Sequence, residues 1–176
     1  MKTIKKIILT GLLFATVGLT AQNTKDKQVM RDATKAKATL LNKDAGLSKF
    51  FDSAAGYAIF PNVGKGGFII GGASGNGVVY ENGAAIGMTS LKKINIGLQA
   101  GGQAVIEVIF FQNSAALERF KQGNYEFSAE VSAVVADKGE AENASYKEGV
   151  MVFALPKAGL MMDASVGGQK FEYHPF

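Results

Sequence analysis

The sequence predicts an α+β protein: an N-terminal amphipathic helix packed on a strongly curved, mostly antiparallel, glycine-rich β-sheet or barrel-like body with one short inserted helix. Three observations predict this class. Apolar residues between 24 and 54 recur at helical spacing, whereas from Tyr57 onward they alternate with polar or small residues. Glycine is dense between Gly56 and Gly102, where it marks bulges, bends or close approaches of strand backbones.

The first 21 residues have the organisation of a secretory signal peptide. Lys2, Lys5 and Lys6 precede the apolar run Ile7–Leu19, and small residues follow as far as Ala21. The run is shorter than the roughly 20 apolar residues that a membrane-spanning helix needs. We therefore predict cleavage after Ala21 and export to the periplasm or the medium.

The remaining chain, residues 22–176, is predicted to form one domain, helical over 22–54 and β-rich over 55–176. Hydrophobic residues make up 47% of the sequence, which is enough to build a packed core. The chain contains no cysteine, so a disulfide framework is excluded. Between Gln22 and Asp52, seven basic residues face four acidic ones, while the rest of the mature chain is net negative. An anionic partner is therefore expected to meet the N-terminal segment first.

The predicted helix has two distinct sides. Its apolar side comprises Val29, Ala33, Ala36, Leu40, Leu47 and Phe51. Its opposite side carries Lys27, Arg31, Lys35 and Lys49. Gly46 is expected to break or bend the helix, because glycine costs about 1 kcal/mol relative to alanine in a helix interior.

Strands are predicted from the period-two alternation that follows. The clearest alternation lies in Ile94–Ala100 and Phe127–Val135. The other candidates are Tyr57–Phe60, Gly67–Gly71, Val78–Glu81, Ala84–Thr89, Val105–Phe111, Val150–Leu155, Leu160–Ala164 and Lys170–Tyr173. Asn82-Gly83 predicts a two-residue hairpin, because both positions tolerate positive φ.

Two segments interrupt the predicted strands. Asn113–Gln122 is expected to form the short helix, capped by an Asn or Ser at its start and ended by Gly123. Lys138–Lys147 is expected to be a polar loop.

No set of residues in the sequence predicts catalysis, so we expect neither an enzyme nor a cofactor or metal site. Glu107 lies in an apolar run, but strand alternation directs it to a polar partner or solvent, and no second carboxylate or nucleophile is identifiable beside it. His174 is the only histidine, which leaves too few ligands for zinc and none for a triad. The glycines around Lys65 lack the spacing of a phosphate-binding loop. Aromatic residues without a basic strand face do not predict nucleic-acid binding.

Three segments taken together resemble a known family. They read AGYAIFPNVGKGGFIIGG (55–72), GLQAGGQAVIEVIFFQ (97–112) and VFALPKAGLMMDASVGGQKFEY (152–173). Their order and spacing are similar to the SYLF domain, a lipid-binding family found in secreted bacterial proteins and in eukaryotic regulators of cortical actin patches. The resemblance covers nearly all of the chain after the signal peptide, and it implies a helix that engages anionic lipid and a compact β-rich body.

The resemblance also implies a site. The basic residues of the helix are expected to contact the headgroups of anionic phospholipid or phosphoinositide-like lipid: Lys27, Arg31, Lys35, Lys37, Lys43 and Lys49. Phe50 and Phe51 would act as apolar anchors, and Lys65 matches the glycine-rich turn of the family. Actin is not an expected partner, because the chain lacks a dense lysine cluster and an exported protein would not meet cytosolic actin.

Two other functions remain open from the sequence. The signal peptide, the many short strands and the terminal Phe176 fit a small outer-membrane barrel, although Pro175 breaks the alternation of a final barrel strand. An apolar pocket inside the sheet would instead make the protein a carrier of an apolar ligand in the envelope.

Overall fold

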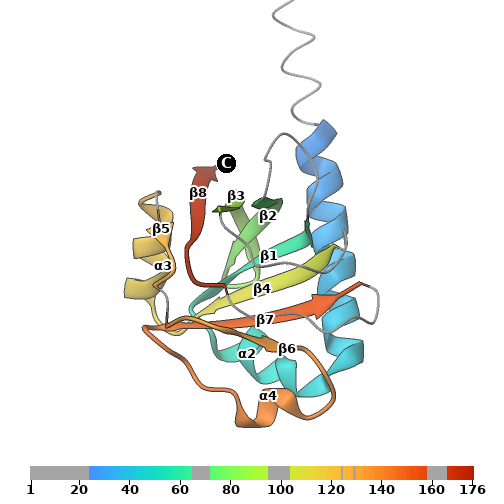
Figure 1. Ribbon diagram of the computed structural model, residues 1–176. Helices are drawn as coiled ribbons and strands as arrows, with labels where there is room; N and C mark the ends of the chain where they lie inside the picture. The colour runs from blue at the N-terminus through green and yellow to red at the C-terminus, as the bar shows by residue number, and fades with distance from the viewer. Residues whose placement is uncertain (1–23, 65–71, 95–103, 124, 129, 158–165) are drawn as a thin grey trace, which may run out of the picture.

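The computed structural model of the chain has the predicted α+β class (Figure 1). It describes residues 24–64, 72–94, 104–123, 125–128, 130–157 and 166–176. The strands assigned among these residues are β1 (Gly56–Val63), β2 (Gly72–Glu81), β3 (Ala84–Ile94), β4 (Val105–Phe111), β5 (Tyr125–Glu126), β6 (Ala133–Val135), β7 (Val150–Pro156) and β8 (Gln169–Pro175). The helical elements are the N-terminal helix (residues 24–43), the 3-10 helix η1 (Ala45–Leu47), α2 (Ser48–Ser53), α3 (Ser114–Lys121) and α4 (Glu140–Asn143).

All these strands belong to one curled sheet. Its order is β5-β8-β3-β2-β1-β4-β7-β6. Every pairing is antiparallel except that of β6 with β7, which is parallel. The strand direction turns progressively from β7 to β8, so that one face of the sheet becomes concave (Figure 1). The prediction of a strongly curved, mostly antiparallel sheet is confirmed.

Two of the predicted turns are confirmed by backbone geometry. Asn82 and Gly83 join β2 to β3 with φ values of 50° and 77°. The Asn113 side chain accepts a hydrogen bond from the Ala116 backbone at 3.0 Å and so caps α3, while Gly123 follows the helix with φ 77°. Both turns therefore depend on residues that the sequence alone identified.

The predicted helical segment, residues 22–54, is interrupted at Asp44 rather than at Gly46. Asp44 has extended backbone angles, φ −142° and ψ 104°, and it caps η1. Its Oδ1 accepts from the Gly46 backbone at 3.0 Å, and its Oδ2 accepts from the Ala141 backbone of α4 at 2.8 Å. The break occurs here because the carboxylate offers the backbone hydrogen bonds that compete with a continuous helix.

Replacing Asp44 with alanine is expected to lower the free energy of unfolding by about 2 kcal/mol. Asp44 is only 3% exposed, so its removal leaves two backbone donors without their acceptor. Urea denaturation followed by far-UV circular dichroism measures the change. Asp44→Asn keeps one acceptor oxygen and should lose less stability; equal losses would show that the hydrogen bonds are not the cause.

The two faces of the sheet carry two separate hydrophobic clusters. On one face, the N-terminal helix, η1, α2 and α4 cover the sheet and bury residues such as Leu40, Phe50 and Phe110. The concave face is filled by α3 and by side chains such as Phe111 and Phe171. The N-terminal helix lies along the outside of the sheet, and its first turns extend beyond the ends of β1 and β4 (Figure 1).

Two sequence predictions were wrong in detail. Phe127–Val135 does not form one strand: only Ala133–Val135 forms β6, because alternation among small residues does not by itself fix a strand. The predicted loop Lys138–Lys147 contains the short helix α4. The strand candidates Gly67–Gly71 and Leu160–Ala164 lie outside the described residues, as do positions 95–100 and the predicted signal peptide.

The prediction that strand glycines mark close backbone approach is confirmed at three described positions. A Cβ atom at Gly56, Gly77 or Gly87 would lie 2.6 Å from a backbone oxygen of the neighbouring strand. These glycines let adjacent backbones and side chains pack where no larger residue fits.

Candidate functional site

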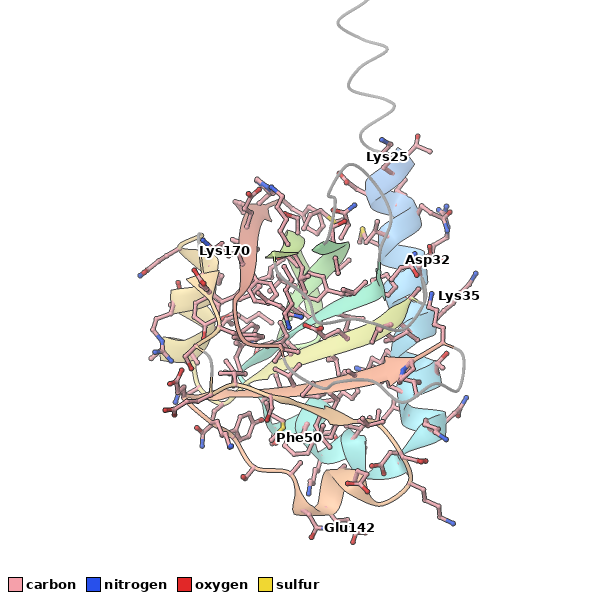
Figure 2. All side chains as sticks on the ribbon, viewed as in Figure 1. Lys25, Asp32, Lys35, Phe50, Glu142 and Lys170 are labelled. Carbon is pink, nitrogen blue, oxygen red and sulfur yellow. The ribbon has the colours of Figure 1, made fainter. Side chains whose placement is uncertain are left out.

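The N-terminal helix presents three cations one turn apart on its outer side. Lys27, Arg31 and Lys35 are all exposed, and we call these three residues the cationic ridge. Figure 2 shows Lys35 pointing away from the sheet. Because positions i, i+4 and i+8 share one side of a helix, the three charges form a line along its axis.

The cationic ridge has few partners within the protein. Arg31 donates to the Gln28 side chain, and Gln28 donates to Asp32 at 2.9 Å. Among the described residues, no ion pair involves Lys27 or Lys35. Like charges four residues apart destabilise a helix by about 0.2–0.5 kcal/mol per pair, so an anionic partner would relieve a repulsion that is present in the free protein.

The apolar side of the same helix is fully occupied. Ala33, Ala36 and Leu40 are buried against the sheet, and Val29 and Met30 pack partly against the same cluster. This side therefore cannot enter a bilayer while the helix remains docked. Only the polar side of the helix is available to a partner.

Lys37 is directed toward the protein instead of toward a partner. Its Nζ donates to the Tyr57 hydroxyl at 3.1 Å and lies 4.3 Å from the centre of the Phe51 ring. Tyr57 in turn stacks on Tyr80 with ring centroids 4.9 Å apart. The ammonium group thus joins the helix to β1 through hydrogen-bond and cation–π contacts.

Lys43 and Lys49 also contact other parts of the chain. Lys43 forms an exposed ion pair with Asp137 at 3.0 Å, and this hydrogen bond lowers the pKa of the Asp137 carboxyl. Lys49 lies within 3.5 Å of the Glu142 backbone oxygen in α4. Both cations are therefore partly neutralised or held close to α4, at the end of the helical layer away from the ridge.

The two proposed apolar anchors belong to the core in this structure. Phe50 is only 4% exposed, and its ring centroid lies 5.4 Å from that of Phe110 and 5.4 Å from that of Phe153. Phe51 is half-buried against Tyr57 and Phe110. Helical spacing had placed Phe51 on the apolar side but not Phe50, because α2 is a separate helix that follows the break at Asp44. The predicted contact Lys65 lies outside the described residues.

Glu107 finds the polar partner that strand alternation predicted. It is 3% exposed on the concave side, where Gln169 Nε2 donates to its Oε2 at 3.0 Å. Burial is the main cause that raises the Glu107 pKa, to about 7. Among the described residues, its hydrogen-bond partner is this amide and not a second carboxylate. The sequence analysis missed Gln169, which alternation with Phe171 in β8 could have placed inside.

A groove of about 530 Å³ lies beside α3 and β5. Its lining includes Arg119, Glu126 and Glu148 as well as Tyr125 and Phe127. The lining of this groove therefore mixes charged and aromatic side chains. Within the described residues, no helix combines the length and the hydropathy that a bilayer-crossing segment requires.

Comparisons with known proteins agree with the resemblance seen in the sequence. The family described as "Ysc84: Las17-binding protein actin regulator" matches residues 92–174, a segment that excludes the N-terminal helix. "Beta cell expansion factor A" of Aeromonas veronii is 32% identical over 142 residues, which cover 79% of this chain and 53% of that protein. The chain thus spans about half the length of this curated relative, and neither description names an enzymatic activity. Given the α+β fold and these two matches, the chain belongs to the SYLF domain family.

Proposed function

We propose that the protein binds anionic lipid surfaces through the cationic ridge. The observation that carries the proposal is the line of Lys27, Arg31 and Lys35 on the exposed side of a helix whose other side is docked on the sheet. The lipid-binding character of the family supports it. No reacting group is needed for this function.

The expected mode is electrostatic adsorption without insertion of the helix. The apolar stripe around Leu40 is already buried, so apolar transfer into the bilayer contributes nothing from this helix. Each basic residue near an anionic leaflet contributes about 1 kcal/mol, and three of them contribute about 3 kcal/mol. Adsorption of this kind weakens with salt, because the screening length is about 8 Å at physiological ionic strength.

Reversing the ridge charges is expected to weaken vesicle binding by roughly 100-fold or more. The variant is Lys27→Glu, Arg31→Glu and Lys35→Glu, which places three carboxylates where the headgroup contacts are proposed. Co-sedimentation of residues 22–176 with phosphatidylcholine vesicles, with and without phosphatidylglycerol, measures the binding. Wild type should bind only the anionic vesicles, and less at high salt.

The matched control changes the same number of charges elsewhere. Lys138, Lys147 and Lys170 are exposed and lie outside the N-terminal helix. Reversing these three to Glu alters the net charge equally and should keep most of the binding. If both triple variants bind alike, net charge and not the ridge determines adsorption, and the proposed site is wrong. Wild-type binding by the ridge variant would reject the ridge as the site, and failure of the wild-type protein to bind anionic vesicles would reject the function itself.

We propose neither actin regulation nor expansion of beta cells as the function of this chain. The name of the Aeromonas relative refers to expansion of beta cells, and that relative is about twice as long as the region matched here. The family description refers to actin regulation. We propose a lipid surface and not actin as the partner, because the predicted signal peptide would export the chain.

A further inference from the structure

Glu107 and Gln169 meet inside the curled sheet although their strands are not neighbours. The sheet order places β3, β2 and β1 between β8, which carries Gln169, and β4, which carries Glu107. Their hydrogen bond, 3.0 Å long, therefore crosses the concave interior and does not run along a strand pair. A second contact crosses the same interior: the rings of Phe60 in β1 and Phe171 in β8 have centroids 5.8 Å apart.

Both side chains carry an oxygen atom without a partner. Glu107 is 3% exposed and Gln169 is 4% exposed. Glu107 Oε1 and Gln169 Oε1 are buried, and neither has a hydrogen-bond partner among the described residues. An unpaired buried acceptor costs about 1–3 kcal/mol, and more if it is charged. Two unpaired acceptors on side chains that are hydrogen-bonded to each other require an explanation.

A single proton would pair both atoms. An ionised carboxylate only accepts hydrogen bonds, whereas a protonated carboxyl carries one O–H donor. A proton on Glu107 Oε1 can be donated to Gln169 Oε1 while Gln169 Nε2 continues to donate to Glu107 Oε2. The two side chains then form a neutral acid–amide pair joined by two hydrogen bonds.

The charged group that acts on Glu107 from a neighbouring strand is Lys93. Lys93 of β3 lies opposite Gln169 in the strand register, and its charge lowers the Glu107 pKa, as does the Gln169 hydrogen bond. The positions paired with Glu107 on β1 and β7 are Phe60 and Ala154, neither of which titrates. Burial outweighs both lowering effects, so the Glu107 pKa rises from 4.5 to about 7.

We propose that the folded protein holds a proton between Glu107 and Gln169, and that this neutral acid–amide pair holds β8 against β4 across the interior of the sheet. Loss of the proton places two unprotonated acceptor oxygens opposite each other in the core. Strand β8 then separates from the sheet more often. This proposal does not depend on lipid binding.

The direction of the pH effect follows from the two pKa values. The folded state retains the proton up to about pH 7, whereas an opened state in which water reaches Glu107 loses it near pH 4.5. The stabilisation is therefore complete below about pH 4.5 and is lost as the pH rises through about 7. Between about pH 5.5 and about pH 8.5, these values predict a roughly 30-fold rise in the opening equilibrium of β8.

Hydrogen–deuterium exchange of the full chain at these two pH values tests the proposal. After correction for the intrinsic exchange rate, the β8 peptide should lose protection at the higher pH, and a peptide from β1 should lose less. Glu107→Gln should abolish the pH dependence, because its amide group supplies the missing donor at any pH. Glu172→Gln removes an exposed acid of the same strand and should leave the dependence unchanged.

A second measurement keeps the test independent of variant folding. The side-chain carboxyl carbon of Glu107, observed by NMR in the wild-type protein, should titrate near pH 7, and Gln169→Leu should raise this midpoint further. A midpoint near 4.5, or equal corrected protection of β8 at both pH values in the wild-type protein, overturns the proposal.

Discussion

Replacing Phe110 with alanine is expected to lower the free energy of unfolding by about 4 kcal/mol. Phe110 is fully buried, and its ring contacts Phe50, Phe51, Tyr57 and Phe153 with centroid separations of 4.8–6.2 Å. These contacts join β4 to the helical layer. The cavity left by the missing ring would therefore weaken the packing of α2 and the N-terminal helix on the sheet. Urea denaturation followed by circular dichroism measures the loss.

The matched control is Phe176→Ala at the C-terminus. Phe176 is 66% exposed, so its truncation leaves no cavity and should change the stability by less than about 0.5 kcal/mol. Losses of similar size in the two variants would show that the Phe110 cluster is not the main contact between the layers. Such a result would contradict the packing described for this face.

The second large effect is expected from Gly77→Ala, which should destabilise the protein by about 3 kcal/mol. The new Cβ would lie 2.6 Å from the Ile59 carbonyl oxygen and 2.7 Å from Cδ1 of Phe60. Because the Ile59 oxygen belongs to the backbone of the adjacent strand, rotating a side chain cannot remove the clash. Strands β1 and β2 would have to separate at the centre of the sheet. Thermal unfolding by circular dichroism measures the effect.

Gly123→Ala is the appropriate comparison. A Cβ there meets no atom within 4 Å, but the residue has φ 77°, which costs alanine about 1 kcal/mol. The clash at Gly77 should therefore cost clearly more than the backbone strain at Gly123. If Gly123→Ala destabilises the protein more than Gly77→Ala, the backbones of β1 and β2 do not approach each other closely at Gly77.

The docked helix has a consequence for the proposed lipid contact. An isolated amphipathic helix must order itself when it adsorbs, and this ordering costs affinity. Here Ala33, Ala36 and Leu40 already hold the helix on the sheet, so Lys27 and Lys35 are aligned before any partner arrives. The sheet thus acts as a rigid support for the cationic ridge.

Apolar spacing predicted the buried side of the N-terminal helix but not the residue at which the helix ends. Apolar spacing correctly identified the buried side of residues 24–43, because one face of a docked helix must be apolar. It did not locate the break at Asp44, since the competing hydrogen bond comes from Ala141, 97 positions away. Similarly, the apolar run Val105–Phe111 identified β4 with its observed bounds, whereas alternation in Phe127–Val135 identified only the short β6.

Helical spacing placed Lys27, Arg31 and Lys35 opposite the apolar side of the helix, and the fold leaves these three residues exposed. Lys37 is instead drawn to the ring of Phe51 and the hydroxyl of Tyr57. Local spacing left Lys37 off the exposed side, but it did not reveal these contacts, because the aromatic rings come from other elements. Their roles depend on which side of the helix meets the sheet.

The sequence by itself determined the α+β class, the hairpin at Asn82-Gly83 and the cap of α3, because each follows from interactions among residues close together in the chain. Only the tertiary structure decided that Lys37 contacts Tyr57 and that Glu107 meets Gln169. Those contacts join residues tens of positions apart, and the curl of the sheet, which places them together, is a property of all its strands at once.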